Sequence, residues 1–289
     1  MPNTIALAKN YTELLDEVYR NASVTADLTS DLTMSRAGAN ANEIIYPQIS
    51  VTGLGEYDRN SGYTTGAVDL KWKTAAFNYD RGTKISVDVM DNEESRNLAF
   101  GMAGATLMRD KAAPEADAFT FATLAALESI SKTTGTIAGA SQFLDALLTA
   151  WSEMDENEVP QENRILYATA TLLNSVMSLD TTKSREILAK FTVKRAVPQA
   201  RFCTAIELLD GKTPGEELGH YKKSDDGADI NFMIIHKPAI IKFDKHVASN
   251  IIPASSNPDA DADIVKYRKY GLVDGYANKR AGIYVNSKA

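Results

Sequence analysis

Two strand-like runs joined by a polar, glycine-rich segment most constrain the fold of this chain. Ile44–Val51 is rich in β-branched residues, and Val68–Lys73 alternates apolar and polar residues with a period of two. Between them, Gly53–Tyr63 is dense in Gly, Asp, Asn and Ser, the residues that form turns. The pattern predicts an extended hairpin. Its tip carries too little apolar surface to fold back onto a core, so we expect it to be buried against another molecule.

The segment before the hairpin, residues 1–42, has the composition of an arm. Tyr11–Arg20 has helical spacing that places its leucines and Val18 on one face. Ala22–Asn42 is rich in Ser, Thr, Ala and Asn and has few large apolar residues, so it cannot build a core of its own. We expect an extended arm that packs on something else.

A strand within Phe77–Val89 precedes a long helical segment. We expect Asp91 to cap a helix that begins at Asn92, because acidic side chains in a first turn complement the helix dipole. Pro114 interrupts the helical pattern, which resumes beyond it, so one kinked helix or two nearly collinear helices are predicted. The Thr-, Gly- and Ser-rich residues 131–140 are typical of a hinge between two lobes.

Beyond this segment the pattern is α/β. Helical periodicity and short apolar runs predict helices at Gln142–Asn157 and Ala170–Leu179, and strands at Arg164–Ala168, Phe232–Ile235, Ala239–Phe243 and within Ile264–Val285. We expect the strands at 232–235 and 239–243 to flank a turn. The chain therefore divides into an arm (1–42), an extended loop (43–90), a long-helix region (91–140), an α/β region (141–263) and a C-terminal return (264–289), in an α+β architecture.

Composition excludes several classes of protein. The chain has 289 residues, 44% hydrophobic and 24% charged, which suits one large or two small globular domains. A net charge of −7 argues against non-specific coating of nucleic acid, because that affinity comes from Lys and Arg contacts with phosphates. The N-terminus lacks the regions of a signal peptide, and no apolar run is long enough to span a bilayer. We therefore expect a protein made in the cytoplasm, with no membrane partner.

The histidines and the single cysteine predict no catalytic or metal site. His220, His236 and His246 are not at metal-ligand spacing, and none of them pairs with Cys203. Cys203 cannot form an intrachain disulfide, which fits a reducing compartment. Its apolar neighbours favour a buried structural thiol over a nucleophile.

Two further motifs fail as binding sites. Gly211-Lys212-Thr213 resembles the end of a P-loop, but position 206 is Ile where that loop requires glycine. The alternating carboxylates of Asp259–Asp263 would hold a divalent cation only weakly, and a solvated loop is the better interpretation. No cofactor is predicted.

The order of segments, over nearly the whole chain, resembles the major capsid proteins of tailed bacteriophages, whose fold is shared with encapsulin nanocompartments. The arm, the hairpin, the long helix, the α/β lobe and the returning strands follow in the same order. Local motifs carry the same resemblance: Ile49–Asn60 and Tyr79–Gly82 for the extended loop, Val89–Glu94 and Pro114–Ala118 for the spine helix, Phe202–Gly211 for the A-domain, and Tyr267, Tyr270 and Gly271 for the return to the P-domain.

This resemblance implies a phage major capsid fold with an N-terminal arm, an extended β-hairpin loop, a long spine helix in a P-domain and an α/β A-domain. It implies a shell protein and not an enzyme. Copies of the chain would assemble into hexamers and pentamers around packaged double-stranded DNA, contacted non-specifically. The implied partners are scaffolding, portal and head-completion proteins, and the implied location is the virion, after assembly in the host cytoplasm.

Six residues are candidates for contacts between subunits. Aromatic side chains often anchor interfaces, which favours Tyr57, Tyr63 and Trp72 in the hairpin. Charged candidates for ion pairs with a neighbour are Asp58, Arg59 and Arg81. The equally weighted alternative is that these three are solvated loop charges worth about 0–1 kcal/mol each.

Two other functions stay open from the sequence alone. An encapsulin-like shell would share the fold but enclose an enzyme, and a co-purifying cargo protein would distinguish it from a capsid that holds DNA. A hydrolase or transferase that uses the α/β lobe would be a monomer with turnover on common substrates.

Overall fold

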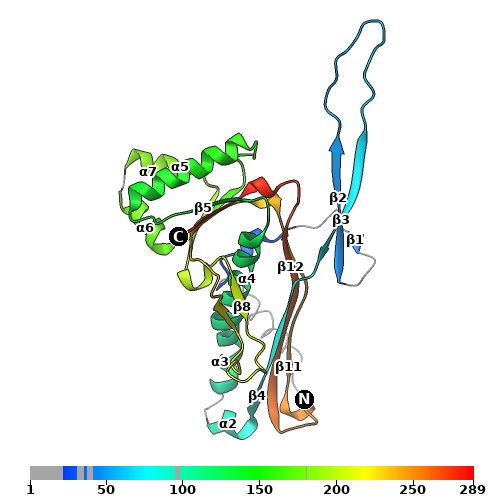
Figure 1. Cartoon of the computed structure of the whole chain (residues 1–289). Helices are drawn as coiled ribbons and strands as arrows, with labels where there is room; N and C mark the ends of the chain where they lie inside the picture. Colours follow the sequence, from blue (N-terminus) through cyan, green and yellow to red (C-terminus); the bar gives the residue numbers. More distant parts are fainter. Residues whose placement is uncertain (1–21, 31–35, 38–41, 95–97, 180) are drawn as a thin grey trace.

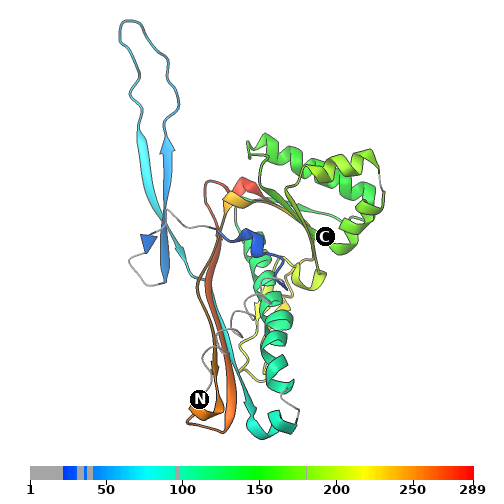
Figure 2. The same ribbon diagram turned by 180° about the vertical axis from the view of Figure 1, so that it is seen from behind.

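The computed structural model describes residues 22–30, 36–37, 42–94, 98–179 and 181–289. These residues form a compact lobe, an elongated lobe and a hairpin that projects from them (Figure 1). Figure 2 shows the same arrangement from behind, with the long helix lying beside the long strands. The helix predicted at Tyr11–Arg20, and most of the arm predicted at 1–42, lie outside the described residues.

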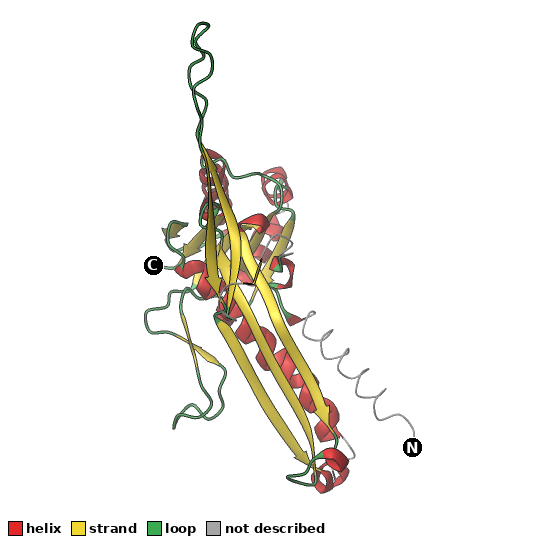
Figure 3. Cartoon of the chain, turned by 90° about the vertical axis from the view of Figure 1, so that its right-hand side faces the viewer, coloured by secondary structure: helices red, strands yellow, loops and turns green. Residues whose placement is uncertain are grey.

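Three long antiparallel strands form the sheet of the elongated lobe (Figure 3). In spatial order they are β11 (Ile240–Ile252), β12 (Ala262–Gly275) and β4 (Tyr79–Asp88). Side chains of β12 alternate between the two faces, so Val265 and Tyr267 are buried while Lys266 and Arg268 are exposed. β4, grouped with the hairpin on sequence grounds, belongs to this lobe by its pairing with β12.

A long helical segment, the spine, lies along this sheet. It comprises α2 (Val89–Glu94), α3 (Leu98–Thr106), the π-helical turn η2 (Leu107–Ala112) and α4 (Ala113–Ala126). Pro114 is the second residue of α4, within continuous helical backbone, and its missing N–H interrupts the helical hydrogen bonding at this point. The π-helical turn directly before Pro114 widens the winding at this point. The predicted interruption of one long helix at Pro114 is thus confirmed.

The predicted start of this helix is wrong by a few residues. α2 begins at Val89, and Asp91 lies inside its first turn instead of capping it. Asp88 occupies the capping position, where its Oδ1 accepts a hydrogen bond from the Met90 N–H at 2.9 Å. A carboxylate at either position can accept hydrogen bonds from the unpaired N–H groups at the start of the helix. Sequence alone therefore did not show whether Asp88 or Asp91 is the capping residue.

The compact lobe is built on a five-stranded sheet. Its spatial order is β5 (Ser131–Thr134), β13 (Ile283–Ser287), β10 (Ile230–His236), β6 (Arg164–Thr169) and β7 (Val193–Val197). The helices of this lobe are α5 (Ala140–Glu156), α6 (Ala170–Leu179) and α7 (Thr182–Ala189). The predicted hinge at 131–140 is partly wrong, because its first four residues form β5 and pair in parallel with β13.

The two strands predicted around residues 236–238 exist but do not form a hairpin. β10 pairs with β6 and β13, whereas β11 pairs with β12 in the other lobe. The 3-10 turn η4 (Lys237–Ala239) carries the chain from one sheet to the other. The remaining short elements are η1 (Ala26–Leu28), β1 (Arg36–Ala37), η3 (Gln199–Arg201), β8 (Ile206–Leu208), β9 (Tyr221–Lys223), η5 (Ala254–Ser256) and η6 (Arg280–Gly282).

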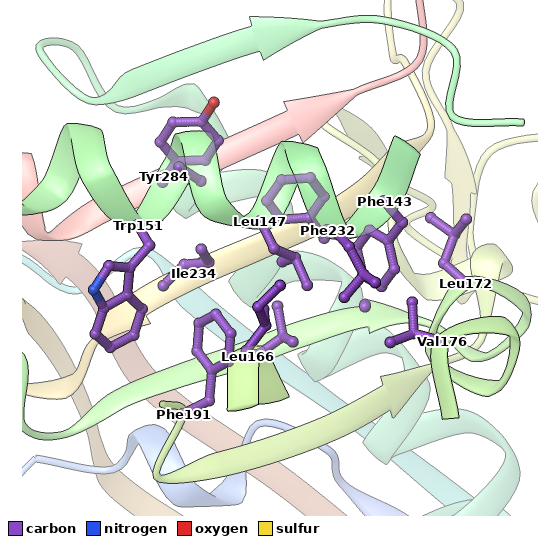
Figure 4. Packing of buried hydrophobic residues seen from close by; sticks show 14 of the residues in the cluster. Phe143, Leu147, Trp151, Leu166, Leu172, Val176, Phe191, Phe232, Ile234 and Tyr284 are labelled. Carbon is purple, nitrogen blue, oxygen red and sulfur yellow. The ribbon is translucent and has the colours of Figure 1, made fainter. Parts of the chain in front are cut away.

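One core lies between the five-stranded sheet and the helices of the compact lobe (Figure 4). The predicted apolar face of α5 is confirmed, since Phe143, Leu147 and Trp151 are all buried. The Phe143 ring meets Phe232 of β10 edge-on at 5.6 Å, and Trp151 meets Phe191 in the same way at 5.2 Å. This core anchors the compact lobe independently of the spine.

A second core joins the two lobes. Phe121 and Leu124 of α4 pack against Tyr167 and Met233 on the other face of the five-stranded sheet. Leu28, from the N-terminal part of the chain, is fully buried in the same cluster. The spine therefore packs against the sheets of both lobes.

Candidate assembly surfaces

The predicted hairpin is confirmed and projects beyond both lobes (Figures 1 and 3). β2 (Glu43–Val51) pairs antiparallel with β3 (Val68–Ala76), and β1 adds a short third strand beside β2. Residues 52–67 connect the two long strands. The hairpin is therefore a narrow ribbon, with no second layer over its distal part.

Among the described residues, the buried side chains that fix the base of the hairpin to the elongated lobe share one face of the ribbon. Ile44, Tyr46 and Ala75 share that face and are buried in a cluster with Ile241 of β11 and Leu272 of β12. The Tyr46 ring also meets the Tyr276 ring edge-on at 5.0 Å. This packing orients the ribbon with respect to the long sheet.

The opposite face of the ribbon carries exposed apolar side chains over its distal part. Register places Ile49 opposite Leu70, and Val51 opposite Val68, so all four side chains lie on one face. They are 59%, 49%, 67% and 70% exposed, respectively. Trp72 is on the same face and is 47% exposed. We call these five residues the apolar stripe.

The alternation of apolar and polar residues in Val68–Lys73 is typical of a strand with one buried face, but every residue of this run is exposed within one subunit. Seven consecutive residues of β3, from Val68 to Thr74, are exposed, because the ribbon extends past the lobe that would cover it. A contiguous exposed apolar surface on a soluble protein usually marks an interaction site. The subunit itself therefore does not supply the burial that this periodicity predicts.

Four of the six predicted contact residues lie together at the hairpin tip. The Tyr57 and Tyr63 rings are 4.8 Å apart, and these residues are 56% and 89% exposed. Asp58 closes the turn between them, since its Oδ1 accepts the Asn60 N–H at 2.6 Å and the Ser61 N–H at 3.1 Å. These backbone hydrogen bonds hold the pKa of Asp58 below its usual value. Arg59 and its neighbours in this turn are exposed.

Arg81 lies elsewhere, in an ion-pair network inside the subunit. Its Nε lies 2.7 Å from Oε1 of Glu115 in α4, and its Nη2 donates to the carbonyls of Leu209 at 2.7 Å and His220 at 3.2 Å. Burial disfavours the charged form of Glu115, but the adjacent His220 ring and Arg81 guanidinium hold its pKa below the usual range. The Arg81 charge is thus already paired within the chain, and its role between subunits stays a prediction.

A groove that sequence did not predict lies beside this network. It has a volume of about 410 Å³ and runs between β4, the π-helical turn and the β8–β9 loop. Lysines from each of these segments line it: Lys84, Lys111 and Lys212. Its walls come from segments more than a hundred residues apart, so no local motif marks it in the sequence.

The described side chains that could act in catalysis or bind a metal lie apart from one another. Among the described residues, no three His, Cys, Asp or Glu side chains are gathered where they could hold a metal ion. Cys203 is buried, as predicted, and burial together with the nearby Asp229 carboxylate raises the pKa of its thiol. Burial and the neighbouring Arg164 and Lys279 lower the pKa of His236. None of these groups is placed to act with a second one as nucleophile and base.

The P-loop-like residues 211–213 lie in a loop, and the acidic run 259–263 is a loop that leads into the first two residues of β12. Asp210 Oδ1 accepts the N–H groups of Lys212 and Thr213, which makes an Asx turn without a following helix. Asp263 at the end of the acidic run accepts the Ala254 N–H at 2.8 Å. In the part of the chain that the structure describes, no helix is both long and apolar enough to cross a membrane.

Lobes, spine and hairpin together define the shell-subunit fold of tailed-phage capsids, and comparison with solved structures supports this class. A capsid structure of cyanophage P-SCSP1u aligns with 93% of this chain and 88% of its own, with a TM-score of 0.62 and 12% identity. Mycobacterium phage Che8 aligns over 91% and 90% of the two chains, with a TM-score of 0.58 and 15% identity. A virus-like particle from Pyrococcus furiosus aligns over 98% and 100%, with a TM-score of 0.59 and 9% identity.

The sequence itself matches no family model and no curated protein. At these identities the similarity is one of fold. This chain has the phage major capsid fold, of the α+β class, as its order of segments implied.

Proposed function

We propose that this chain is the major capsid protein of a tailed phage, which assembles with copies of itself into the hexamers and pentamers of an icosahedral shell around double-stranded DNA. The observation that carries the proposal is the projecting hairpin with its apolar stripe, on a chain of which 91% and 93% align with two phage structures. The dispersed chemistry of the subunit fits a structural protein better than an enzyme.

The hairpin would supply the contact between neighbours. Its base is rigidly packed, its distal face is apolar, and its tip presents two aromatic rings that can enter a pocket on another subunit. Tyr57, Asp58, Arg59, Tyr63 and Trp72 all lie on this ribbon. Several interfaces of roughly 1,600 Å² each would bury such surfaces in a closed shell.

The negative net charge of the chain is compatible with a shell that encloses DNA. A net charge of −7 keeps non-specific affinity for phosphates low, so packaged DNA would slide past the shell without being gripped. Scaffolding, portal and head-completion proteins are the further partners that a shell of this kind would use, in the host cytoplasm during assembly and in the virion afterwards.

Deletion of the hairpin tip tests the proposal. Replacing residues 53–66 with a two-residue turn should leave the circular dichroism spectrum and the midpoint of thermal unfolding close to wild type, because the tip contacts neither core. Negative-stain microscopy should show shells for the wild type and only free subunits or small oligomers for the deletion. Normal shells from the deleted protein would refute the assembly role of the hairpin.

A shell that encloses a protein cargo is the second candidate. The fold is shared with a virus-like particle from Pyrococcus furiosus, over 98% of this chain and all of that one, so the fold does not separate the two candidates. Nuclease-resistant DNA inside purified shells would support the capsid function, whereas a stoichiometric co-purifying protein without DNA would support the cargo shell.

A further inference from the structure

Residues 22–30 cross the junction between the two lobes, and we call this segment the clasp. Figure 2 shows it in dark blue beside one end of α4. Apart from Ala22, which is helical, and the three residues of η1, the clasp forms no regular structure, and it pairs with no sheet. Side-chain contacts and isolated backbone hydrogen bonds attach the clasp to the rest of the subunit.

Asp117 of α4 is the main attachment point of the clasp. Its carboxylate is fully buried and accepts hydrogen bonds from Ser23 Oγ at 2.7 Å, the Val24 N–H at 3.0 Å, and both the N–H and the hydroxyl of Thr25. Arg201 pairs with the same carboxylate at 3.2 Å and also donates to the Ala22 carbonyl. A buried carboxylate needs such partners, and here most of them come from the clasp.

Lys242 of β11 provides a second attachment point, of opposite charge. Its buried ammonium donates to the Thr25 carbonyl at 2.9 Å and to the Thr25 hydroxyl at 2.5 Å. The Ser30 N–H donates to the Lys242 carbonyl, and Ser30 Oγ donates to the Ile240 carbonyl, both at 2.9 Å. Thr25 thus bridges a buried anion on the spine and a buried cation on the long sheet.

The clasp also reaches the compact lobe. Leu28 is fully buried in the core that joins the lobes. Asp27 pairs with Arg195 of β7 at 2.7 Å, in a half-exposed ion pair. The clasp therefore touches the spine, the long sheet and the five-stranded sheet within nine residues.

We propose that the clasp is a releasable device that sets the angle between the two lobes. Its release breaks no strand pairing and none of the helices α2 to α7, so each lobe can stay folded while the junction opens. When the clasp is released, the Asp117 carboxylate and the Lys242 ammonium lose Thr25 and must take new partners or water. Partial release is therefore unfavourable, which favours two states, one with the clasp bound and one with it released. A subunit that occupies both hexamers and pentamers needs more than one lobe angle, but the device itself is a property of the single chain.

Leu28→Ala tests this inference on the full-length protein. Hydrogen exchange of the Val24, Thr25 and Ser30 amides should accelerate at least tenfold, while the amides of β6 and β10 keep their protection. Leu172→Ala is the matched control, because Leu172 is buried in the core of the compact lobe alone. That control should leave clasp exchange unchanged.

The angle between the lobes is measured separately, by distances between two spin labels. One label is attached to the compact lobe at Glu156→Cys in α5, and the other is attached to the spine beside the elongated lobe at Met102→Cys in α3. Cys203→Ser removes the native thiol, so that only these two positions are labelled. Leu28→Ala should broaden or shift the distance distribution, and Leu172→Ala should not. Ser23→Ala, which removes one hydrogen bond to Asp117 and no core contact, should produce a smaller shift in the same direction.

Either of two results would overturn the proposal. One is faster clasp exchange with an unchanged distance distribution, which would make the clasp a passive surface segment. The other is a uniform rise in exchange throughout both lobes for Ser23→Ala as well as Leu28→Ala, which would make it an ordinary part of the cooperative core. Both measurements use unassembled subunits, so they are independent of whether the chain forms shells.

Discussion

Replacing Ile49 and Leu70 together by serine should weaken assembly without unfolding the subunit. These residues face each other across the ribbon and are 59% and 49% exposed, so they contribute little to the fold of one subunit. Burying a whole Ile or Leu side chain is worth about 1.5–3 kcal/mol. Burying the exposed half of each therefore contributes about 1.5–3 kcal/mol per hairpin contact, which corresponds to roughly 10- to 150-fold in affinity.

Assembly is followed by light scattering and size-exclusion chromatography over a range of subunit concentrations. The double variant should need at least tenfold more protein to form shells, while its urea midpoint stays at the wild-type value. Asp69→Ser with Lys71→Ser is the control, because it changes the polar face of the same strand and keeps the net charge. Equal assembly of both double variants would refute burial of the apolar stripe between subunits.

Three further substitutions test the subunit itself. Arg164→Leu should lower the free energy of unfolding by about 3–5 kcal/mol in urea titrations, because the buried guanidinium satisfies several carbonyls and an ion pair. Burial lowers the pKa of Lys242 to about 8 from 10.5, so wild-type stability should rise between pH 8 and 10 by up to about 1.4 kcal/mol per unit. Lys242→Met should abolish that rise. Gly82→Ala should destabilise the protein by about 1–3 kcal/mol, since its Cβ would lie 2.8 Å from the Tyr267 carbonyl oxygen; Gly53→Ala, in open space, should change nothing in the same thermal melt.

The sign of the Lys242 prediction follows from proton counts. Between its folded pKa of about 8 and its unfolded value of 10.5, the unfolded chain holds a proton that the folded protein has lost. Raising the pH therefore favours the folded state, and the gain is lost again as the pH falls through 8. A wild-type profile that is flat from pH 8 to 10, or a Lys242→Met profile that still rises, would show that Lys242 is not the group responsible.

Local patterns in the sequence predicted the elements with strong periodicity. The apolar face of α5, the two strands of the hairpin and the interruption at Pro114 each follow from spacing within one segment. The hairpin was recognised by its turn-rich tip, and its lack of apolar content correctly indicated that the tip would not fold back. These features depend on residues close in sequence, which is where propensity and periodicity carry information.

Features that depend on long-range contacts were not predictable in this way. Arg81 looked like a free charge in an extended loop, but β4 turns into the long sheet and places it beside Glu115. The strand β5 was taken for a hinge, because a run of Ser, Lys and Thr becomes a strand only when β13 is there to pair with it. The clasp has no apolar periodicity, and its attachment depends on two buried charges, Asp117 and Lys242, that lie far away in sequence.

Neighbouring residues of β11 connect the hairpin to the clasp. Ile241 points to one face of the long sheet and packs under the hairpin base, whereas Lys242 points to the other face and binds the clasp. A displacement of the ribbon base would therefore reach the clasp through adjacent residues of one strand. Because the buried side chains at the base of the ribbon share one face, rotation of the ribbon must move Ile241 or break that packing. If the hairpin docks on a neighbour and the clasp sets the lobe angle, as proposed above, the two would be coupled through β11, and a neighbour's contact would bias the conformation of the subunit that makes it.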